Sequence, residues 1–260
     1  MIDQEAIVQT LSTNHFGKKV FSFDSIDSTN TFAKNVERII APHGTVVIAE
    51  EQTAGRGRLQ RNWRSTKGEN LLFTVILYPE FDVEKIVLLP FVGSLAVVDA
   101  IETVTGLTAT CKWPNDVLIN SKKICGMLLE SSSGSAGIER IVLGIGVNVN
   151  QIEFSEELVG KASSLRIESG NNVDRIRLLQ SILEALELRY HQLSSFPPVQ
   201  ILNDWKMKAL LFGKKILVLE HECSFTATAI DVAEDGSLII ETGEGEKRNL
   251  FAGDVSLAYE

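Results

Sequence analysis

Four arginines lie close together in the segment TAGRGRLQRNWR, residues 53–64, which we call the arginine loop. A guanidinium group binds a carboxylate or a phosphate through two parallel hydrogen bonds, and glycines allow a ligand to approach the backbone. If the segment is extended, Arg56 and Arg58 point the same way, and Trp63 offers a flat face to a ring. These residue types favour a nucleotide site. The alternative is a solvated basic loop with Trp63 packed in the core.

A lysine begins an apolar strand in the segment SKKICGMLLE. Alternation along a strand puts Lys123 on the same face as Cys125, Met127 and Leu129. A lysine that leads such a face either extends to solvent or meets an anion in a cleft. Gly126 removes a side chain nearby, which favours close approach of a neighbouring group.

The segment GIGVNVN predicts a strand with one bare face. Its apolar side chains alternate with residues that have small or amide side chains, namely Gly144, Gly146, Asn148 and Asn150. Bare backbone occurs where a ligand or another segment comes close, and an asparagine can pair with the edge of adenine. A strand that is crossed closely by a helix is the alternative.

The segment CKWPNDV brings a lysine and an acid together within a few residues. Pro114 requires an extended residue before it, and the Asn-Asp pair that follows favours a turn. Lys112 can meet a phosphate, and Asp116 can hold Mg²⁺, which prefers carboxylate oxygens together with phosphate oxygens. An ordinary turn between strands would explain the same residues.

Together these segments resemble the biotin protein ligases. The resemblance rests on DSTN, EEQTAGRGRLQRNW, KWPNDV, KKICGMLLE and GIGVNVN, which occur in that order within residues 27–150. It implies that ATP and biotin are substrates of a reaction in two steps. The biotin carboxylate attacks the α-phosphate of ATP, which gives biotinyl-5′-AMP and pyrophosphate. A lysine of a biotin carboxyl carrier domain then attacks the mixed anhydride and forms an amide.

The resemblance also implies a role for each matching residue. The catalytic residues would be Lys123, Arg58 and Asp116. Biotin would be bound by Ser28, Thr29, Gln52, Gly55, Arg56, Lys123 and Gly126. ATP and the adenylate would be bound by Arg56, Arg58, Arg61, Trp63, Lys112 and Asn148. Asp116 would orient Mg²⁺ or the incoming lysine, and Ser28 and Thr29 would also cap a helix.

Two features distinguish the chain from parts of the family. Many members have a glycine where this chain has Gln60, so closure of the arginine loop is expected to differ in detail. Some members begin with a DNA-binding helix-turn-helix domain. Only about twenty residues precede the first expected strand here, which is too few for that unit. We therefore expect a ligase that is not also a repressor.

The resemblance and the hydrophobic pattern imply an α+β fold. We expect a biotin/lipoate ligase-like catalytic domain over residues 1–211, with a mixed sheet flanked by helices, and a small SH3-like β-barrel over residues 212–260. Helices are predicted over residues 3–12, 27–40, 83–106, 173–193 and 199–211, with a break near Pro90. Strands are predicted over residues 18–25, 44–51 and 70–78, and as three or four short strands within 108–150. Four more are predicted in the C-terminal part, over residues 214–220, 224–232, 237–242 and 246–253.

Two of these predictions are specific enough to check in detail. In the helix over residues 27–40, the side chains of Phe32, Ala33, Val36, Ile39 and Ile40 fall on one face. The serine-rich segment over residues 131–137 is expected to form a flexible hairpin loop.

Composition limits the other function classes. With a net charge of −9 and 44% hydrophobic residues, the chain is typical of a globular protein and not of a general nucleic-acid binder. The apolar stretch over residues 86–101 contains Pro90 and Asp99, so we expect a buried helix pair and no membrane partner. No secretory signal is visible, which favours the cytoplasm. A homodimer is left open.

Two alternatives remain at this point. A lipoate or octanoate ligase has the same catalytic fold, although the arginine loop and KWPND favour biotin. A nucleic-acid-binding module is the alternative from a different class, and the acidic charge counts against it.

We predict that the arginine loop is mobile without ligands and becomes ordered with biotin and ATP, because its glycines and like charges give it little reason to settle alone. Limited proteolysis by trypsin after Arg56, Arg58 or Arg61 should slow when both ligands are present. Equal cleavage rates with and without the ligands would contradict this.

Overall fold

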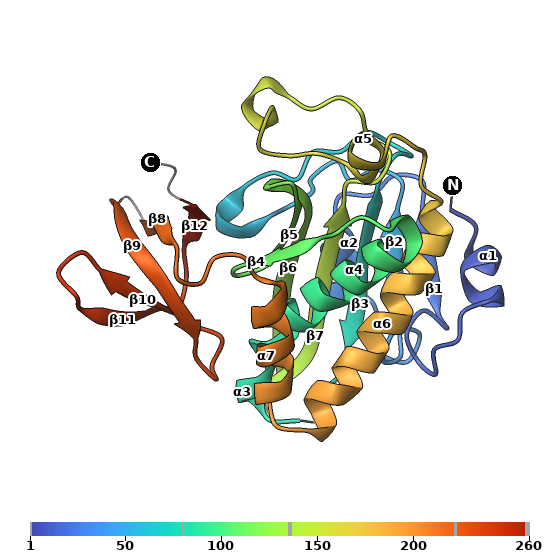
Figure 1. The fold of residues 1–260 in the computed structure, drawn as a ribbon. Coiled ribbons are helices and arrows are strands. Elements are labelled where there is room, and N and C mark those ends of the chain that lie inside the picture. The colour runs from blue at the N-terminus through green and yellow to red at the C-terminus, as the bar shows by residue number, and fades with distance from the viewer. Residues whose placement is uncertain (1, 80, 135–136, 221–222, 258–260) are drawn as a thin grey trace.

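The chain forms two separate β-sheets (Figure 1). The structure is a computed structural model that describes residues 2–79, 81–134, 137–220 and 223–257. Seven strands form the first sheet, in the order β1-β2-β3-β7-β6-β5-β4. Strands β1 and β2 are parallel, whereas the other neighbours in this sheet are antiparallel. The predicted mixed sheet is therefore confirmed.

The elements have the following bounds. The first sheet contains β1 (Val20–Phe23), β2 (Val46–Ala49), β3 (Leu71–Leu77), β4 (Thr110–Lys112), β5 (Asp116–Ile119), β6 (Lys122–Gly134) and β7 (Gly137–Val147). The helices are α1 (Gln4–Gln9), α2 (Thr29–Asn35), α3 (Val83–Ile86), α4 (Leu89–Thr105), α5 (Leu165–Ser169), α6 (Arg175–Ser195) and α7 (Val199–Lys208). Two short 3₁₀ turns are η1 (Arg58–Gln60) and η2 (Glu156–Leu158).

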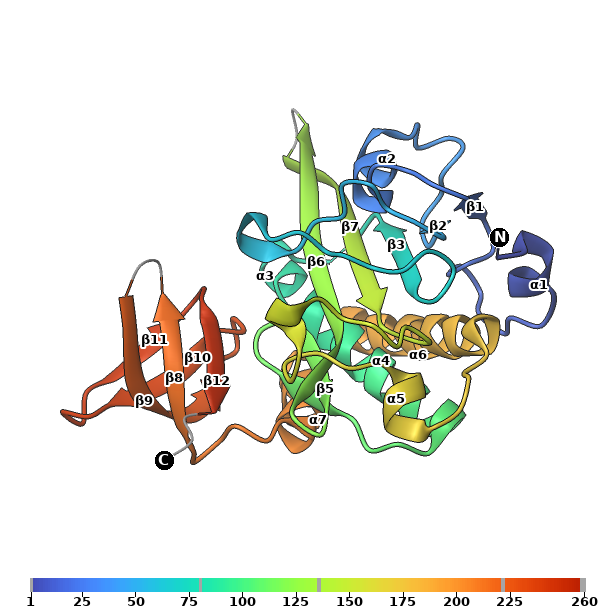
Figure 2. The ribbon, with the colours of Figure 1, turned by 90° about the horizontal axis from the view of Figure 1, so that it is seen from above.

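The second sheet contains the last part of the chain. Its strands are β8 (Lys215–Glu220), β9 (Cys223–Val232), β10 (Leu238–Thr242), β11 (Lys247–Leu250) and β12 (Asp254–Leu257). They are antiparallel, in the order β11-β10-β9-β8-β12. Figure 2 shows this sheet beside the main body of the chain, and it corresponds to the predicted SH3-like barrel.

Helices cover the two faces of the first sheet differently. Helices α4 and α6 lie together on one face, where most of the apolar core is found (Figure 1). Helix α4 comes so close that a Cβ on Gly93 would lie 2.8 Å from Sδ of Met127. Helix α2 lies on the other face, over a smaller core. Strand β7 presents Leu143 to α4, whereas on its other face Gly144 leaves room for Asn30 of α2.

The most apolar stretch of the chain is buried. Val83–Thr105 is long and apolar enough to cross a membrane, but 72% of its most apolar window is buried inside the structure. It forms two helices, with the break before Leu89, and Pro90 lies in the first turn of α4. A proline costs no helical hydrogen bond there, because the first N–H groups of a helix have no partner within it. The predicted buried helix pair is confirmed.

The two sheets are joined by buried side chains. The indole Nε1 of Trp113, which is 2% exposed, donates a hydrogen bond of 3.0 Å to the carbonyl oxygen of Gly236 in the β9–β10 turn. A Cβ on Gly236 would lie 3.1 Å from Leu88 and 3.2 Å from Phe91. This turn therefore fits closely against the first sheet and its helices, which fixes the second sheet beside β4 and β5.

One predicted helix is too long. Helix α2 ends at Asn35, and Val36 is extended, with φ −65° and ψ 140°. The chain then turns so that Ala41 enters the small core under α2, where a continuous helix would not bring it. As a result Ile39 is 87% exposed and Ile40 is 51% exposed, and the predicted common face is wrong beyond Val36.

Two further differences concern strands. The serine-rich segment is not a loop as far as Gly134, because β6 continues through it and pairs with β7. Backbone pairing does not depend on apolar side chains, so composition gave no sign of this. Residues 135–136 of that prediction lie outside the described residues. Strand β12 was not predicted, and it pairs with β8 at the edge of the second sheet.

We predict that Gly144→Ala destabilises the fold. A Cβ at this position would lie 2.4 Å from Oδ1 of Asn30, whose side chain is fixed by neighbouring polar groups. Such overpacking costs about 1–3 kcal/mol of the free energy of unfolding. Denaturant unfolding measures it, and Gly243→Ala is the control, because nothing lies within 4 Å of a Cβ there. Equal midpoints for the two variants would show that Asn30 has room to move.

Candidate active site

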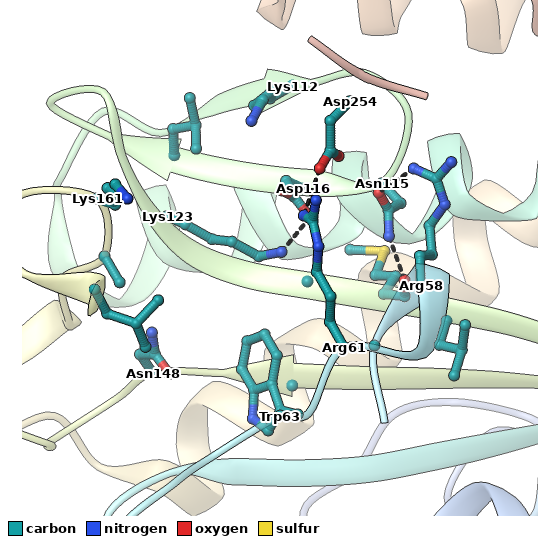
Figure 3. Close-up of a pocket in the computed structure, with 18 of the residues that line it drawn as sticks. Arg58, Arg61, Trp63, Lys112, Asn115, Asp116, Lys123, Asn148, Lys161 and Asp254 are labelled. Carbon is teal, nitrogen blue, oxygen red and sulfur yellow. Dashed lines mark hydrogen bonds and ion pairs between the residues drawn. The ribbon is translucent and has the colours of Figure 1, made fainter. Parts of the chain in front are cut away.

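A cavity of about 810 Å³ lies over β6 and β7 and is shown in part in Figure 3. Its walls come from the arginine loop, from β4 and β5, from residues 154–162, and from β12 of the second sheet. Most of the predicted site residues line it: Ser28, Thr29, Gln52, Arg56, Arg58, Arg61, Trp63, Lys112, Asp116, Lys123, Gly126 and Asn148. The fold therefore brings together motifs that are separated by up to 120 residues in the sequence, from Ser28 to Asn148.

Two glycines form the floor beneath Trp63. Gly126 of β6 and Gly146 of β7 are paired in register. A Cβ on Gly146 would lie 2.7 Å from the Trp63 ring, and one on Gly126 would lie 3.0 Å from it. The bare face predicted for the segment GIGVNVN is confirmed: the Trp63 indole approaches it at Gly146, and at Gly144 Asn30 of helix α2 does so, as in the alternative. The Trp63 Nε1 atom is buried and has no hydrogen-bond partner among the described residues.

Lys123 lies on the opposite side of β6 from the predicted one. The register between β5 and β6 shifts between Val117 and Leu118, so that Val117 is paired with Cys125 but Leu118 with Lys123. A bulge of this kind redirects side chains near a site. The Lys123 side chain therefore lies over Gly126, where an added Cβ would be 2.8 Å from its Cε, and not on the apolar face with Cys125.

Lys123 is held by an acid from the next strand. Its Nζ lies 2.7 Å from Oδ1 of Asp116 and 5.6 Å from the centre of the Trp63 ring (Figure 3). The Asp116 side chain is 12% exposed, whereas that of Lys123 is 36% exposed. The ammonium group thus lies at the surface of the cavity, anchored on one side and accessible to an anion on the other.

The arginine loop is not extended as a whole. The turn η1 begins at Arg58, and Leu59 has φ 54° and ψ 39°, in the left-handed region. Arg56 and Arg58 therefore point to different elements, and the prediction that they point the same way is wrong. Arg56 donates to Thr31 of α2, whereas Arg58 donates to Asn115 before β5.

Arg58 is the most buried cation of the loop. It donates to Oδ1 of Asn115 at 3.2 Å and to the carbonyl oxygen of Gly253 at 3.4 Å. Burial lowers the pKa of its guanidinium, against the opposing charges of Asp254 and Asp116. A guanidinium remains charged after such a shift, so Arg58 presents a poorly hydrated positive charge to the cavity.

The second sheet contributes an acid that sequence analysis missed. Asp254 of β12 forms an ion pair with Arg61 (Figure 3). Glu130 of β6 and Lys161 were missed as well, and Lys161 lines the cavity while its carbonyl oxygen accepts from the Lys123 N–H. Lys161 and Asp254 lie outside the segments quoted above. Glu130 ends the segment KKICGMLLE, but its contact with Arg56 depends on the fold and not on local pattern.

Polar groups gather at the start of α2. The N–H and hydroxyl of Thr29 donate to Oε1 of Gln52 at 2.8 and 3.0 Å. The Ser28 hydroxyl accepts from the N–H of Thr31, so Ser28 caps the helix as predicted. Ser28 and Thr29 are 4% and 3% exposed, yet both line the cavity. They therefore contribute polar groups to the cavity wall while being largely shielded from bulk water.

Two of the predicted site residues, Gly55 and Asn148, already make contacts within the protein that hold them in place. Gly55 is buried and does not line the cavity. Its carbonyl oxygen accepts from the N–H of Trp63, and a Cβ there would lie 2.8 Å from the Trp63 oxygen. Asn148 lines the cavity at 5% exposure, but its Nδ2 already donates to the carbonyl oxygen of Ser163 at 3.1 Å.

Metal binding by side chains alone finds little support. Within the described ranges, no group of three or more His, Cys, Asp or Glu side chains is arranged to hold a metal ion. Asp116, the predicted Mg²⁺ ligand, is paired with Lys123. A magnesium ion at this site would need phosphate oxygens for most of its ligands.

Comparison with known proteins agrees with this geometry. Residues 22–148 match the Biotin/lipoate A/B protein ligase family, and residues 211–258 match the Biotin protein ligase C terminal domain. The first match covers the predicted motifs almost completely. The second covers the five-stranded sheet that contributes Asp254 to the cavity.

Similar proteins cover nearly the whole chain. The bifunctional ligase/repressor BirA of Bacillus spizizenii is 36% identical over 95% of this chain and 76% of its own length. The biotin–[acetyl-CoA-carboxylase] ligase of Paracoccus denitrificans is 31% identical over 85% of this chain and 93% of its own.

Solved structures give the same result. The biotin protein ligase from Aquifex aeolicus, in complex with biotin and ATP, is 31% identical and has a TM-score of 0.80. It is matched over its full length by 94% of this chain. The ordered motifs, the fold and these relatives agree, and the chain belongs to the biotin protein ligase family.

Proposed function

We propose that this chain is an ATP-dependent biotin protein ligase that adenylates biotin and transfers it to a lysine of a carrier domain. The observation that supports this most directly is the gathering of Lys123, Arg58 and the polar groups of α2 around one cavity. The related Aquifex enzyme was solved with biotin and ATP, and the related Paracoccus enzyme is named as a biotin ligase.

Biotin would bind with its ring end near α2. Thr29 and Gln52 supply a hydroxyl and an amide there, and these groups suit the donors and acceptors of a cyclic urea. Arg56 also contacts the first turn of α2, where its Nη2 lies 3.3 Å from the Thr31 hydroxyl. It would bind the carboxylate of biotin and then the phosphate of the adenylate.

The first chemical step joins two anions. A carboxylate oxygen of biotin forms a bond to the α-phosphorus of ATP, and the bond from that phosphorus to the bridging oxygen breaks, which releases pyrophosphate. Negative charge on the non-bridging oxygens is stabilised best by cations that are already in place. Lys123 and Arg58 fit this role. Lys123 is fixed by its ion pair with Asp116, and Arg58 is fixed by its hydrogen bond to Asn115.

The outgoing phosphates and the adenine need separate contacts. Arg61 and Lys112 line the cavity on the side of β12 and β4 and would meet the pyrophosphate. Trp63 and Asn148 would position adenine, with Trp63 supported by the glycine floor. Arg61 would exchange its pairing with Asp254 for a phosphate when ATP binds.

The second step needs a neutral amine from the carrier domain. Its nitrogen attacks the carbonyl carbon of biotinyl-5′-AMP, the bond from that carbon to the phosphate oxygen breaks, and AMP leaves as the amine loses a proton. Asp116 would orient the incoming lysine while it is still an ammonium group, as its carboxylate already does with Lys123, and that group loses a proton to water before its nitrogen attacks. The arginine loop and β12 would shield the anhydride from water.

Magnesium would act with the phosphates of ATP and not as a resident ion. Asp116 is the residue that would contact it, which requires Lys123 to move toward the α-phosphate. When bound, the ion would neutralise phosphate charge and orient the leaving pyrophosphate.

We also propose that residues 1–211 and 212–260 are two domains that share the site. The start of the second family match at residue 211 supports this division. So does the change from a helix-covered sheet to a five-stranded antiparallel one after α7.

Biotin and lipoate can be distinguished by ATP–pyrophosphate exchange, which reports the first step alone. We expect exchange driven by biotin and not by lipoate or octanoate. The match to a biotin-specific C-terminal domain supports this choice. Exchange driven equally well by lipoate would favour the alternative ligase.

We predict that Lys123→Ala lowers biotin-dependent exchange by about 10²–10³-fold, the usual effect of removing one group that stabilises transition-state charge. Lys122→Ala is the matched control, because Lys122 is the preceding residue and is paired at 3.5 Å with Glu168 outside the cavity. It should keep nearly full activity. Thermal unfolding confirms that both variants fold, and a folded Lys123→Ala enzyme with normal exchange would rule out the role.

A further inference from the structure

One acid of β6 binds two cations and has no role so far. Oε1 of Glu130 accepts from Nζ of Lys34 at 2.6 Å. Its Oε2 accepts from Nδ2 of Asn30 at 2.8 Å and from Nη2 of Arg56 at 3.4 Å. Glu130 ends the segment KKICGMLLE, where no role has been given to it, and it contacts Arg56 of the arginine loop directly.

The Glu130 carboxylate is held from beneath by a buried network. Asn30, which is 4% exposed, also donates to the carbonyl oxygen of Leu128 at 3.3 Å. Oγ1 of Thr74 lies 2.6 Å from Oδ1 of Asn30 and 2.8 Å from Oγ1 of Thr29. Asn30 is buried, so losing its hydrogen bonds would leave polar atoms without partners, which is unfavourable. It therefore keeps the Glu130 carboxylate in a fixed position.

Arg56 needs such an anchor more than the other cations of the site. Its side chain is 41% exposed, and Glu130 is its ion-pair partner in the described part of the chain. Its guanidinium also donates to the neutral hydroxyl of Thr31 at 3.3 Å. A long side chain with weak contacts loses rotamer freedom when it binds a ligand, unless a neighbour has already restricted it.

We propose that Glu130 is a positioning residue that holds one edge of the Arg56 guanidinium, so that the rest of it faces the carboxylate of biotin. This inference rests on the proposed function, because it acts through the contact between Arg56 and biotin. Glu130 itself need not touch either substrate. The Asn30 and Thr74 contacts connect it to Thr29, so one network holds both ends of the biotin site.

The ionisation of Glu130 fits this role. Burial alone would raise the pKa of its carboxyl, but hydrogen bonds from Lys34 and Asn30 and the charge of Arg56 outweigh it and keep the pKa below its ordinary value. The carboxylate is therefore charged at neutral pH, when the anionic substrates bind. The other cation, Lys34, binds Oε1 of the carboxylate, whereas Asn30 and Arg56 bind Oε2. Lys34 therefore provides a matched control for Arg56.

The test is a double-mutant cycle with Glu130→Gln and Arg56→Ala, measured as kcat and KM for biotin in ATP–pyrophosphate exchange. Glutamine keeps the volume of the side chain but removes the charge that holds Arg56. We expect Glu130→Gln to raise the KM for biotin about five- to tenfold, with a smaller change in kcat. In the Arg56→Ala background the same substitution should change KM less than twofold.

Two controls separate positioning from a loss of structure. Lys34→Ala removes the other cation from the same carboxylate and should leave the KM for biotin within twofold of the wild type. Thermal unfolding should give similar midpoints for all the variants. If Glu130→Gln lowers the midpoint, Glu130→Asp provides a second charged variant that is too short to reach Arg56, and it should raise KM in the same way.

The outcomes separate the two proposals. An equal rise in KM in both backgrounds, or no rise in an active enzyme, would overturn the role of Glu130 and leave the ligase function standing. A wild-type protein with no biotin-driven exchange would overturn the proposed function, and the role of Glu130 with it.

Discussion

The site depends on a patch of sheet without side chains. Where Gly126 and Gly146 face each other across β6 and β7, Trp63 and the end of Lys123 lie directly on the backbone, and Asn30 does the same over Gly144. A Cβ on any of these three glycines would push those groups outward. The glycines thus set the depth of the cavity and the position of the groups that line it.

Charge balance explains why an acidic chain gathers arginines. Three cations of the cavity form ion pairs with acids from other elements: Arg56 with Glu130, Arg61 with Asp254, and Lys123 with Asp116. These pairs are partly exposed and contribute little to stability. Each pair holds the side chain of its cation in one orientation before the substrate anions bind. Less side-chain conformational entropy is then lost on binding.

The second sheet forms part of the site, because residues at its edge contact the arginine loop. Trp113 and Gly236 fix it against the first sheet, and from there Gly253 and Asp254 reach the arginine loop. The loop is therefore enclosed by two units whose relative position is set by buried contacts. Loss of those contacts would act on Arg58 and Arg61 even though they lie in another part of the chain.

Local pattern determined much of this protein: the long helices, the mixed sheet, the glycine face of β7 and the motifs that place the chain in its family. It could not determine where Lys123 points, because a bulge in the pairing of β5 with β6 sets that. Nor could it show that Asp254 and Glu130 reach the arginine loop. Side-chain direction depends on strand register, and ion pairs depend on which distant segments meet. Strand register and long-range ion pairs are properties of the folded chain, because residues that are adjacent in sequence do not determine them.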